Sequence, residues 1–97
     1  MWRVDFTADA VRQFKKLPRA VRPLIKDAIK AQLIESDPED TTRNELRLRR
    51  PSLHADYELR AGEWRVFYRV DRQRVLVTLI GEKRGAGLFV EGEELRL

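Results

Sequence analysis

The chain has 97 residues, enough for one compact domain, so we expect a single domain spanning 1–97. Hydrophobic residues make up 42% and charged residues 37%, with a net charge of +4, as in a folded domain with a densely ionic surface. The absence of cysteine excludes disulfides and thiolate metal sites, and no apolar run reaches the roughly 18 residues that a membrane span requires. The N-terminal stretch also lacks the apolar core of a signal peptide, so we expect a cytoplasmic protein without a membrane partner.

The first forty residues predict a strand followed by a helical hairpin. Residues 2–6 (WRVDF) alternate apolar and polar side chains, as a short strand does. Thr7 is a suitable N-cap for a first helix that ends before Pro18. Pro23 is unfavourable inside the second helix, which therefore either begins late, near Val21, or is kinked in its first turns. The helical spacing of the second segment comes from Val21, Leu24, Ile25, Ala28, Ile29 and Leu33.

The second half predicts an antiparallel sheet. Residues 41–55 are polar and basic and predict a loop with at most one short strand, and Gly81–Gly87 predicts another loop. The segment after residue 87 forms either a final hairpin around Glu91 and Gly92 or a docked tail. The order β-α-α-β-β-β predicts an α+β fold, in which the N-terminal helical hairpin packs on one face of a small antiparallel sheet and leaves the other open. The three central strands are predicted at Tyr57–Arg60, Trp64–Val70 and Arg74–Ile80.

Positive charge is concentrated in this predicted sheet. Residues 42–84 hold 11 basic and 6 acidic side chains, a net charge of +5, and 10 of those 11 are arginines. Arginine binds phosphate and carboxylate groups through two parallel hydrogen bonds and stacks on bases. The sequence therefore favours a polyanion or an acidic peptide as partner, and the alternative is a solvated basic face.

Side-chain alternation places these arginines on the open face of the sheet. In WRVFYRV the even-numbered apolar residues should meet the helices, and Arg65, Phe67 and Arg69 should face solvent. The preceding strand adds Glu58 and Arg60 to the same face. Arginines around an aromatic ring offer charge for phosphate and a flat surface for a base, which favours RNA binding. The alternative is that these charges neutralise one another as surface ion pairs, worth about 0–1 kcal/mol each.

Motifs for several other chemistries are missing. His54 is the single histidine, so no zinc site can be assembled, and no Gly-Lys-Ser/Thr phosphate loop is present. Ser36 and Ser52 lack the context of a catalytic nucleophile. We therefore predict neither a metal nor a cofactor, and disfavour a metal-dependent or triad hydrolase.

Four segments together resemble the RelE/ParE superfamily of type II toxin–antitoxin toxins: FKKLP, the helix end SDP, YELRAGEWRVFYRVD and VLVTLIGEKRG. The resemblance covers roughly residues 4–89 and implies the RelE-like form of the fold described above. It also implies function: RelE-like members cut mRNA in the ribosomal A site without a metal, using the RNA's own 2′-hydroxyl as nucleophile. ParE-like members share the fold and inhibit DNA gyrase. Both kinds are silenced by an antitoxin that wraps the toxin, so an antitoxin, the ribosome and mRNA are the implied partners.

The resemblance also assigns catalytic residues. The family's key strand arginine matches Arg65 in GEWR, where it would bind the scissile phosphate. Its arginine at the strand end matches Arg84 or Lys83 in GEKR, and Arg60 matches a basic position before the turn. Further RNA contacts are predicted for Lys83, Arg69, Phe67, Arg47, Arg49 and Arg50.

Other parts of the RelE site are absent. By spacing, the positions of the two RelE lysines are occupied here by Asp56 and Glu58. The C-terminal tyrosine of RelE has no counterpart, and the nearby Phe89 cannot donate a proton. Cleavage through a 2′-oxyanion requires a base, positive charge on the phosphate and an acid for the 5′-oxygen. Some toxins of the superfamily use a carboxylate as base, which points to Glu58 or Glu45.

The acid is less well defined. His54 and Tyr68 are the candidates, although Tyr68 is predicted to face the helices. The leading hypothesis is a toxin that inhibits translation by ribosome-dependent mRNA cleavage. The alternatives are a ParE-like gyrase inhibitor and a non-catalytic relic that binds RNA or an antitoxin.

Overall fold

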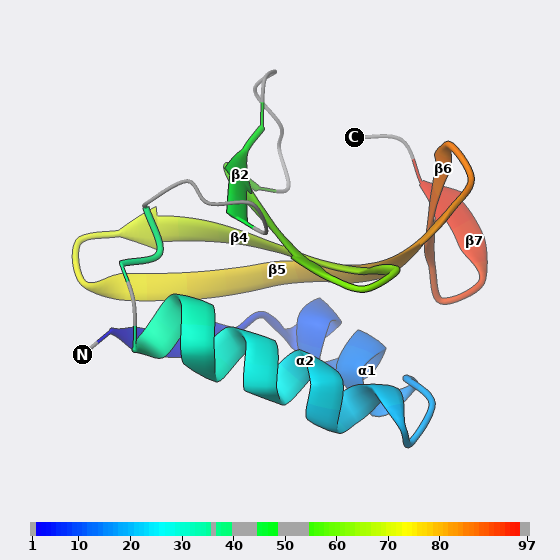
Figure 1. Cartoon of the computed structure of the whole chain (residues 1–97), viewed down its shortest axis with the longest axis horizontal. Helices are drawn as coiled ribbons and strands as arrows, with labels where there is room; N and C mark the ends of the chain where they lie inside the picture. Colours follow the sequence, from blue (N-terminus) through cyan, green and yellow to red (C-terminus); the bar gives the residue numbers. More distant parts are fainter. Residues whose placement is uncertain (1, 36, 40–44, 49–54, 96–97) are drawn as a thin grey trace.

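The computed structural model describes residues 2–35, 37–39, 45–48 and 55–95. Within these ranges, two helices cover one face of a seven-stranded sheet, which confirms the α+β arrangement (Figure 1). The strands follow the order β2-β3-β4-β5-β6-β7, and β1 pairs with β5. The elements are β1 (Arg3–Phe6), α1 (Ala8–Lys15), α2 (Val21–Ile29), its π-helical continuation η1 (Lys30–Ile34), β2 (Glu45–Arg47), β3 (Tyr57–Ala61), β4 (Trp64–Asp71), β5 (Arg74–Arg84), β6 (Gly87–Val90) and β7 (Glu93–Leu95).

One strand pair departs from the predicted antiparallel sheet. β1 runs parallel to β5, with Arg3 opposite Arg74 and Phe6 opposite Val77. A parallel pair needs a long crossover connection, and the segment between these strands, which includes both helices, provides it. The remaining neighbours are antiparallel, as expected.

The helices begin where the local sequence predicts. The Oγ1 of Thr7 accepts a hydrogen bond from the backbone N–H of Ala10 at 3.1 Å, which confirms the N-cap. α2 starts at Val21, so Pro23 falls in the first turn, where backbone N–H groups have no acceptor within the helix. Leu24 is 45% exposed, so the predicted apolar stripe was too wide. None of the helices in the described ranges is long and apolar enough to cross a membrane.

The main core lies between the helices and the sheet. The even-numbered residues of β4 point into it as predicted, and the rings of Tyr57 and Tyr68 stack there with centroids 5.2 Å apart. Burial of each large apolar side chain contributes about 1.5–3 kcal/mol, so this layer dominates the stability of the fold. Its fully buried members include Ala10, Ile25, Leu33, Leu59, Val66, Tyr68, Val75 and Val77.

A β-bulge lies near the middle of β5. Phe67 of β4 is opposite Leu79, but its neighbour Tyr68 is opposite Val77, so Thr78 has no opposite residue. At this point the side of β5 that faces the helices changes from odd to even residue numbers. A bulge also bends the strand and increases its twist.

The C-terminal part of the sheet is more regular than the sequence predicts. β5 continues to Arg84 and β6 begins at Gly87, so the prediction of a loop over Gly81–Gly87 was wrong. Of the two alternatives for the C-terminal segment, the hairpin is the one that forms, with φ of 53° at Glu91 and 85° at Gly92 in its turn. β2 and the β6–β7 hairpin stand on either side of the sheet face that the helices leave uncovered (Figure 1).

The glycine at position 81 reflects close packing. A Cβ atom on Gly81 would lie 2.9 Å from the Cδ1 of Leu88 and 2.9 Å from the backbone oxygen of Phe89. The absence of a side chain therefore lets β6 approach β5 closely. The sequence shows the glycine but not this tertiary contact, which is why a loop was predicted.

The uncovered face has a small core of its own. Phe67 is 1% exposed at the centre of this second cluster, although an open face was predicted. The residues that cover it come from β6, β7 and the segments flanking β2 and β3. The cluster consists of Ala55, Phe67, Leu79 and Leu88, with Leu48, Val90 and Leu95 packed against it.

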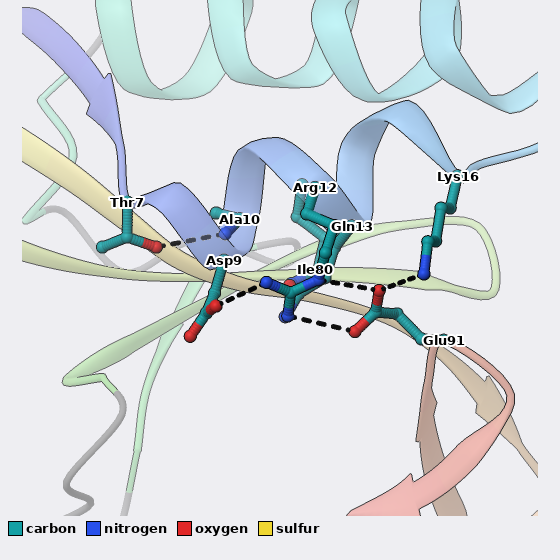
Figure 2. A network of polar contacts seen from close by, with 8 residues as sticks. All are labelled: Thr7, Asp9, Ala10, Arg12, Gln13, Lys16, Ile80 and Glu91. Carbon is teal, nitrogen blue, oxygen red and sulfur yellow. Dashed lines mark hydrogen bonds and ion pairs between the residues drawn. The ribbon is translucent and has the colours of Figure 1, made fainter.

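α1 closes a gap along the edge of β5. β1 pairs with β5 as far as Val77 and β6 pairs from Glu82 onward, so the edge between them has no strand beside it. The side chain of Gln13, which is 6% exposed, accepts a hydrogen bond from the backbone N–H of Ile80 at 2.8 Å (Figure 2). Gln13 thus supplies the acceptor that a neighbouring strand would otherwise provide.

Candidate functional site

Arg65 is held at the edge of the β3–β4 turn. Its Nη1 donates to the backbone oxygens of Gly62 at 2.8 Å and Trp64 at 2.9 Å. Gly62 has φ of 61°, a conformation that glycine adopts readily, so the turn itself positions these acceptors. No acceptor in the described ranges bonds the other guanidinium N–H groups of Arg65, and no carboxylate pairs with it. They are therefore available to an anionic ligand.

Glu58 and Arg60 form an ion pair on β3. The Nε of Arg60 donates to Oε1 of Glu58 at 2.8 Å. The Glu58 side chain is 16% exposed and that of Arg60 is 45% exposed. For Arg60, then, the prediction of a charge neutralised within the surface is the accurate one. The pair also fixes the direction of the Glu58 carboxylate.

A pocket of about 560 Å³ opens on the uncovered face and brings several of the predicted residues together. Glu58, Arg65 and Lys83 line it from three neighbouring strands, and Glu94 joins them from β7. The lining therefore holds two cations and two carboxylates. The remaining wall is formed by Phe67, Ala86, Gly87, Leu88 and Leu95.

The sequence left open whether Arg84 or Lys83 matches the family's arginine at the strand end. In the structure, Lys83 is the one of the two that lines the pocket with Arg65. Because β5 is a strand through Arg84, these two neighbours point to opposite faces of the sheet. Lys83 donates weakly to the backbone oxygen of Ala86 at 3.3 Å, and no carboxylate in the described part of the chain pairs with it. Arg84 instead pairs with Glu82 at 2.8 Å and lines a different pocket, so its predicted place beside Arg65 was wrong.

The predicted RNA contacts are spread more widely. Phe67 is on the expected face, but its burial leaves no ring surface for a base, which corrects that prediction. Arg69 lies four residues beyond Arg65 on the same strand, about 13 Å away, and does not line the pocket. The side chains of Glu45 and Arg47, and all of Arg49, Arg50 and His54, lie outside the described residues.

The second pocket lies at the other side of β5, next to the helices. It encloses about 550 Å³ between the end of α1 and the β6–β7 turn. Its charged residues are paired: Arg84 binds Glu82 and stacks over the ring of Phe89 with 5.0 Å to the centroid, while Lys16 binds Glu91 at 3.1 Å.

Glu91 is the centre of a polar network that joins the hairpin to α1 (Figure 2). Arg12 donates to both of its carboxylate oxygens, at 3.1 Å and 3.2 Å, and also pairs with Asp9 at 2.7 Å. Hydrogen bonds from Arg12 and then Lys16 lower the pKa of the Glu91 carboxyl. The bond to Glu91, followed by that to Asp9, raises the pKa of Arg12. The network therefore fixes the β6–β7 wall of the sheet to the helical layer.

Comparison with known proteins identifies the family. The family model described as the ParE toxin of the type II toxin–antitoxin system, parDE, matches residues 4–86. The chain belongs to the ParE toxin family of type II toxin–antitoxin systems. A search of curated proteins finds no match. A solved structure, the RelBE2 toxin–antitoxin complex of Mycobacterium tuberculosis, contains a chain of the same fold: the two are 22% identical with a TM-score of 0.63, over 86% of this chain and 98% of the other.

The core of this toxin excludes one of the candidate acids. Tyr68 is fully buried on the helix side, as predicted, and its hydroxyl donates to the backbone oxygen of Pro38 at 2.7 Å. The phenol therefore cannot reach a ligand in the pocket. No group of three or more His, Cys, Asp or Glu side chains in the described part of the toxin is arranged to hold a metal ion.

Sequence reasoning missed Glu94 as a residue of this toxin's pocket. Its position depends on the fold of β6 and β7, which the sequence left open between a hairpin and a tail. Extending β5 to its observed end would have separated Lys83 from Arg84, but simple alternation from Val75 would have placed Arg84 on the uncovered face. The β-bulge at Thr78 is what places Lys83 there. For Glu94, no local pattern in the sequence gives the answer.

Proposed function

We propose that this toxin arrests translation by cutting mRNA on the ribosome, with the pocket of Glu58, Arg65 and Lys83 as its active site. The observation that carries the proposal is that one pocket collects a carboxylate and two cations without carboxylate partners in the described residues. A base, a phosphate-binding group and an acid are the groups that cleavage through the RNA's own 2′-hydroxyl requires.

Each residue then has a defined role. The Glu58 carboxylate takes the proton of the 2′-hydroxyl, and the 2′-oxygen attacks the adjacent phosphorus. Arg65 binds the phosphate oxygens, on which negative charge builds up. The bond from phosphorus to the 5′-oxygen breaks, and the Lys83 ammonium gives that oxygen a proton. The products are a 2′,3′-cyclic phosphate and a free 5′-hydroxyl, and no metal is required.

The proposal includes partners and location. A type II toxin has a cognate antitoxin, and the structure that this fold resembles is a toxin–antitoxin complex. We therefore propose an antitoxin protein as the stable partner, and the ribosome with its mRNA as the target. Action on ribosomes implies that the toxin works in the cytoplasm.

The test compares the wild type, Arg65→Ala and Arg84→Ala after induction in bacteria. Mapping of mRNA 5′ ends within minutes of induction is expected to show new ends inside translated codons for the wild type. Arg65→Ala is expected to reduce them by about 10²-fold or more, because it removes charge that stabilises the transition state. Arg84→Ala is the matched control, since it removes an arginine that lines the other pocket. Equal cleavage by Arg65→Ala and the wild type would contradict the proposal.

The second candidate is inhibition of DNA gyrase by binding alone. The family match favours it, because the matching model is that of ParE toxins, and ParE-like members of the superfamily act on gyrase. Growth arrest without new 5′ ends, together with loss of supercoiling by purified gyrase when the toxin is added, would support this candidate. Active gyrase in excess toxin would exclude it.

A further inference from the structure

Glu94 brings a second carboxylate to the pocket from β7. It lines the same space as Arg65 and Lys83. Its carboxylate packs over the backbone of Gly87, where a Cβ atom would lie 3.3 Å from Oε1 of Glu94. A side chain at position 87 would therefore displace this carboxylate by a few tenths of an ångström.

The two carboxylates of the pocket differ in their partners. Glu58 is held by Arg60 at 2.8 Å, whereas Glu94 has no hydrogen bond or ion pair with any described residue. An ionised carboxylate only accepts hydrogen bonds, and a phosphodiester group has no N–H or O–H to donate. A bound RNA would therefore repel Glu94 through its phosphates unless another part of the nucleotide donated to it.

The ribose 2′-hydroxyl and the edge of a base can donate. In the proposed reaction the 2′-hydroxyl beside the scissile phosphate is already bound by Glu58, which leaves the base edge for Glu94. Guanine presents N1–H and N2–H side by side, which matches the two oxygens of a carboxylate. Adenine and cytosine place an acceptor next to their amino group, and uracil has one N–H between two carbonyls. The pocket, at about 560 Å³, is large enough for one nucleotide, and the partly exposed Leu95 offers apolar surface to the face of a base.

We propose that Glu94 is a specificity residue that selects guanine at the nucleotide next to the scissile phosphate. This rests on the proposed function, since it requires an RNA in the pocket. Arg65 would hold the phosphate while Glu94 accepts from N1–H and N2–H of the guanine.

The experiment maps mRNA 5′ ends for the wild type, Glu94→Gln and Glu93→Gln, and compares the base composition at the cut. Glu93 is the matched control, because it is the neighbouring residue of β7 and does not line the pocket. Wild type and Glu93→Gln are expected to favour guanine equally. Glu94→Gln is expected to lose about tenfold of that preference and to gain adenine, whose donor and acceptor match an amide.

Gly87→Ala gives a second, independent variant. Its Cβ would lie 3.1 Å from Cε1 of Phe89 and 3.3 Å from Oε1 of Glu94, so both side chains must shift, and a weakened guanine preference is expected with Glu94 itself unchanged. Circular dichroism and the thermal midpoint of each variant establish that it is folded. A preference that is the same in the wild type and in folded Glu94→Gln, or a preference for another base, would overturn this inference and leave the cleavage proposal intact. Absence of any new 5′ ends in the wild type would overturn both.

Discussion

The two sides of the sheet near the end of β5 have pockets of similar volume and similar charge, but they use that charge differently. On the helix side, Arg84 and Lys16 each bind a carboxylate. On the other side, Arg65 and Lys83 meet no carboxylate among the described residues. The number of basic residues does not distinguish the two pockets. They are distinguished by whether each cation pairs with a carboxylate. Paired cations hold elements of the fold together, and unpaired cations remain for a ligand.

The strongest test of this comparison truncates two neighbouring residues of β5, one in each variant. Lys83→Ala is expected to reduce mRNA cleavage by about 10²-fold or more, since it removes both charge and the proposed acid. Arg84→Ala should leave cleavage near the wild-type level, because Arg84 is on the other face. Quantified 5′ ends after induction provide the measurement. Equal losses in both variants would end the distinction between the two pockets.

Lys83→Arg sharpens the same test. Arginine keeps the positive charge but does not release a proton in the accessible pH range. If Lys83 is the acid, this variant should still cleave far more slowly than the wild type, although the retained charge keeps it above Lys83→Ala. Cleavage close to the wild-type rate would instead assign Lys83 to phosphate binding.

The next effect concerns the pocket on the helix side of the sheet, which Gln13 lines. Gln13→Met keeps the volume of the side chain but leaves the buried N–H of Ile80 without an acceptor. We expect the free energy of unfolding to fall by about 1–3 kcal/mol in urea titrations. Gln73→Met, an exposed substitution in the β4–β5 turn, is the control and should change it little. A Gln13→Met protein as stable as the wild type would show that another group accepts the hydrogen bond of the Ile80 backbone N–H.

A smaller effect is expected at Tyr68. Tyr68→Phe removes the buried hydrogen bond to Pro38 and should lower the free energy of unfolding by about 0.5–1.5 kcal/mol. Because Tyr68 is buried on the helix side and lines neither pocket, the pattern of mRNA 5′ ends should be unchanged. Loss of cleavage in a folded Tyr68→Phe protein would restore the phenol as the acid and contradict the role given to Lys83.

The smallest effect is the pH dependence of the Glu91 network. The pKa of the Glu91 carboxyl is lowered from the ordinary value of 4.5 by hydrogen bonds from Arg12 and Lys16, so its ionised form is favoured in the folded state. The stabilisation is therefore present above about pH 4.5 and is lost as the pH falls through the folded-state pKa. Thermal midpoints of the wild type and Glu91→Gln should differ at neutral pH and converge in acid. A constant difference across the titration would assign the effect to packing, not to charge.

The local parts of this fold could be predicted from sequence. The Thr7 cap, the start of α2 at Val21 and the alternation along β4 each depend on a few consecutive residues. The errors arose where distant segments meet. β1 joined β5 in parallel, and Gly81 proved to be a contact point for β6 instead of part of a loop.

The sequence by itself determined β1, the two helices, the three central strands and an excess of arginine on one face, because these follow from short-range periodicity and composition. Only the tertiary structure decided which cations form the candidate site. The extension of β5 separated Lys83 from Arg84, and the β6–β7 hairpin buried Phe67 and brought Glu94 to Arg65. These outcomes depend on long-range packing and on the pairing of one charge with another, which no local pattern in the chain encodes.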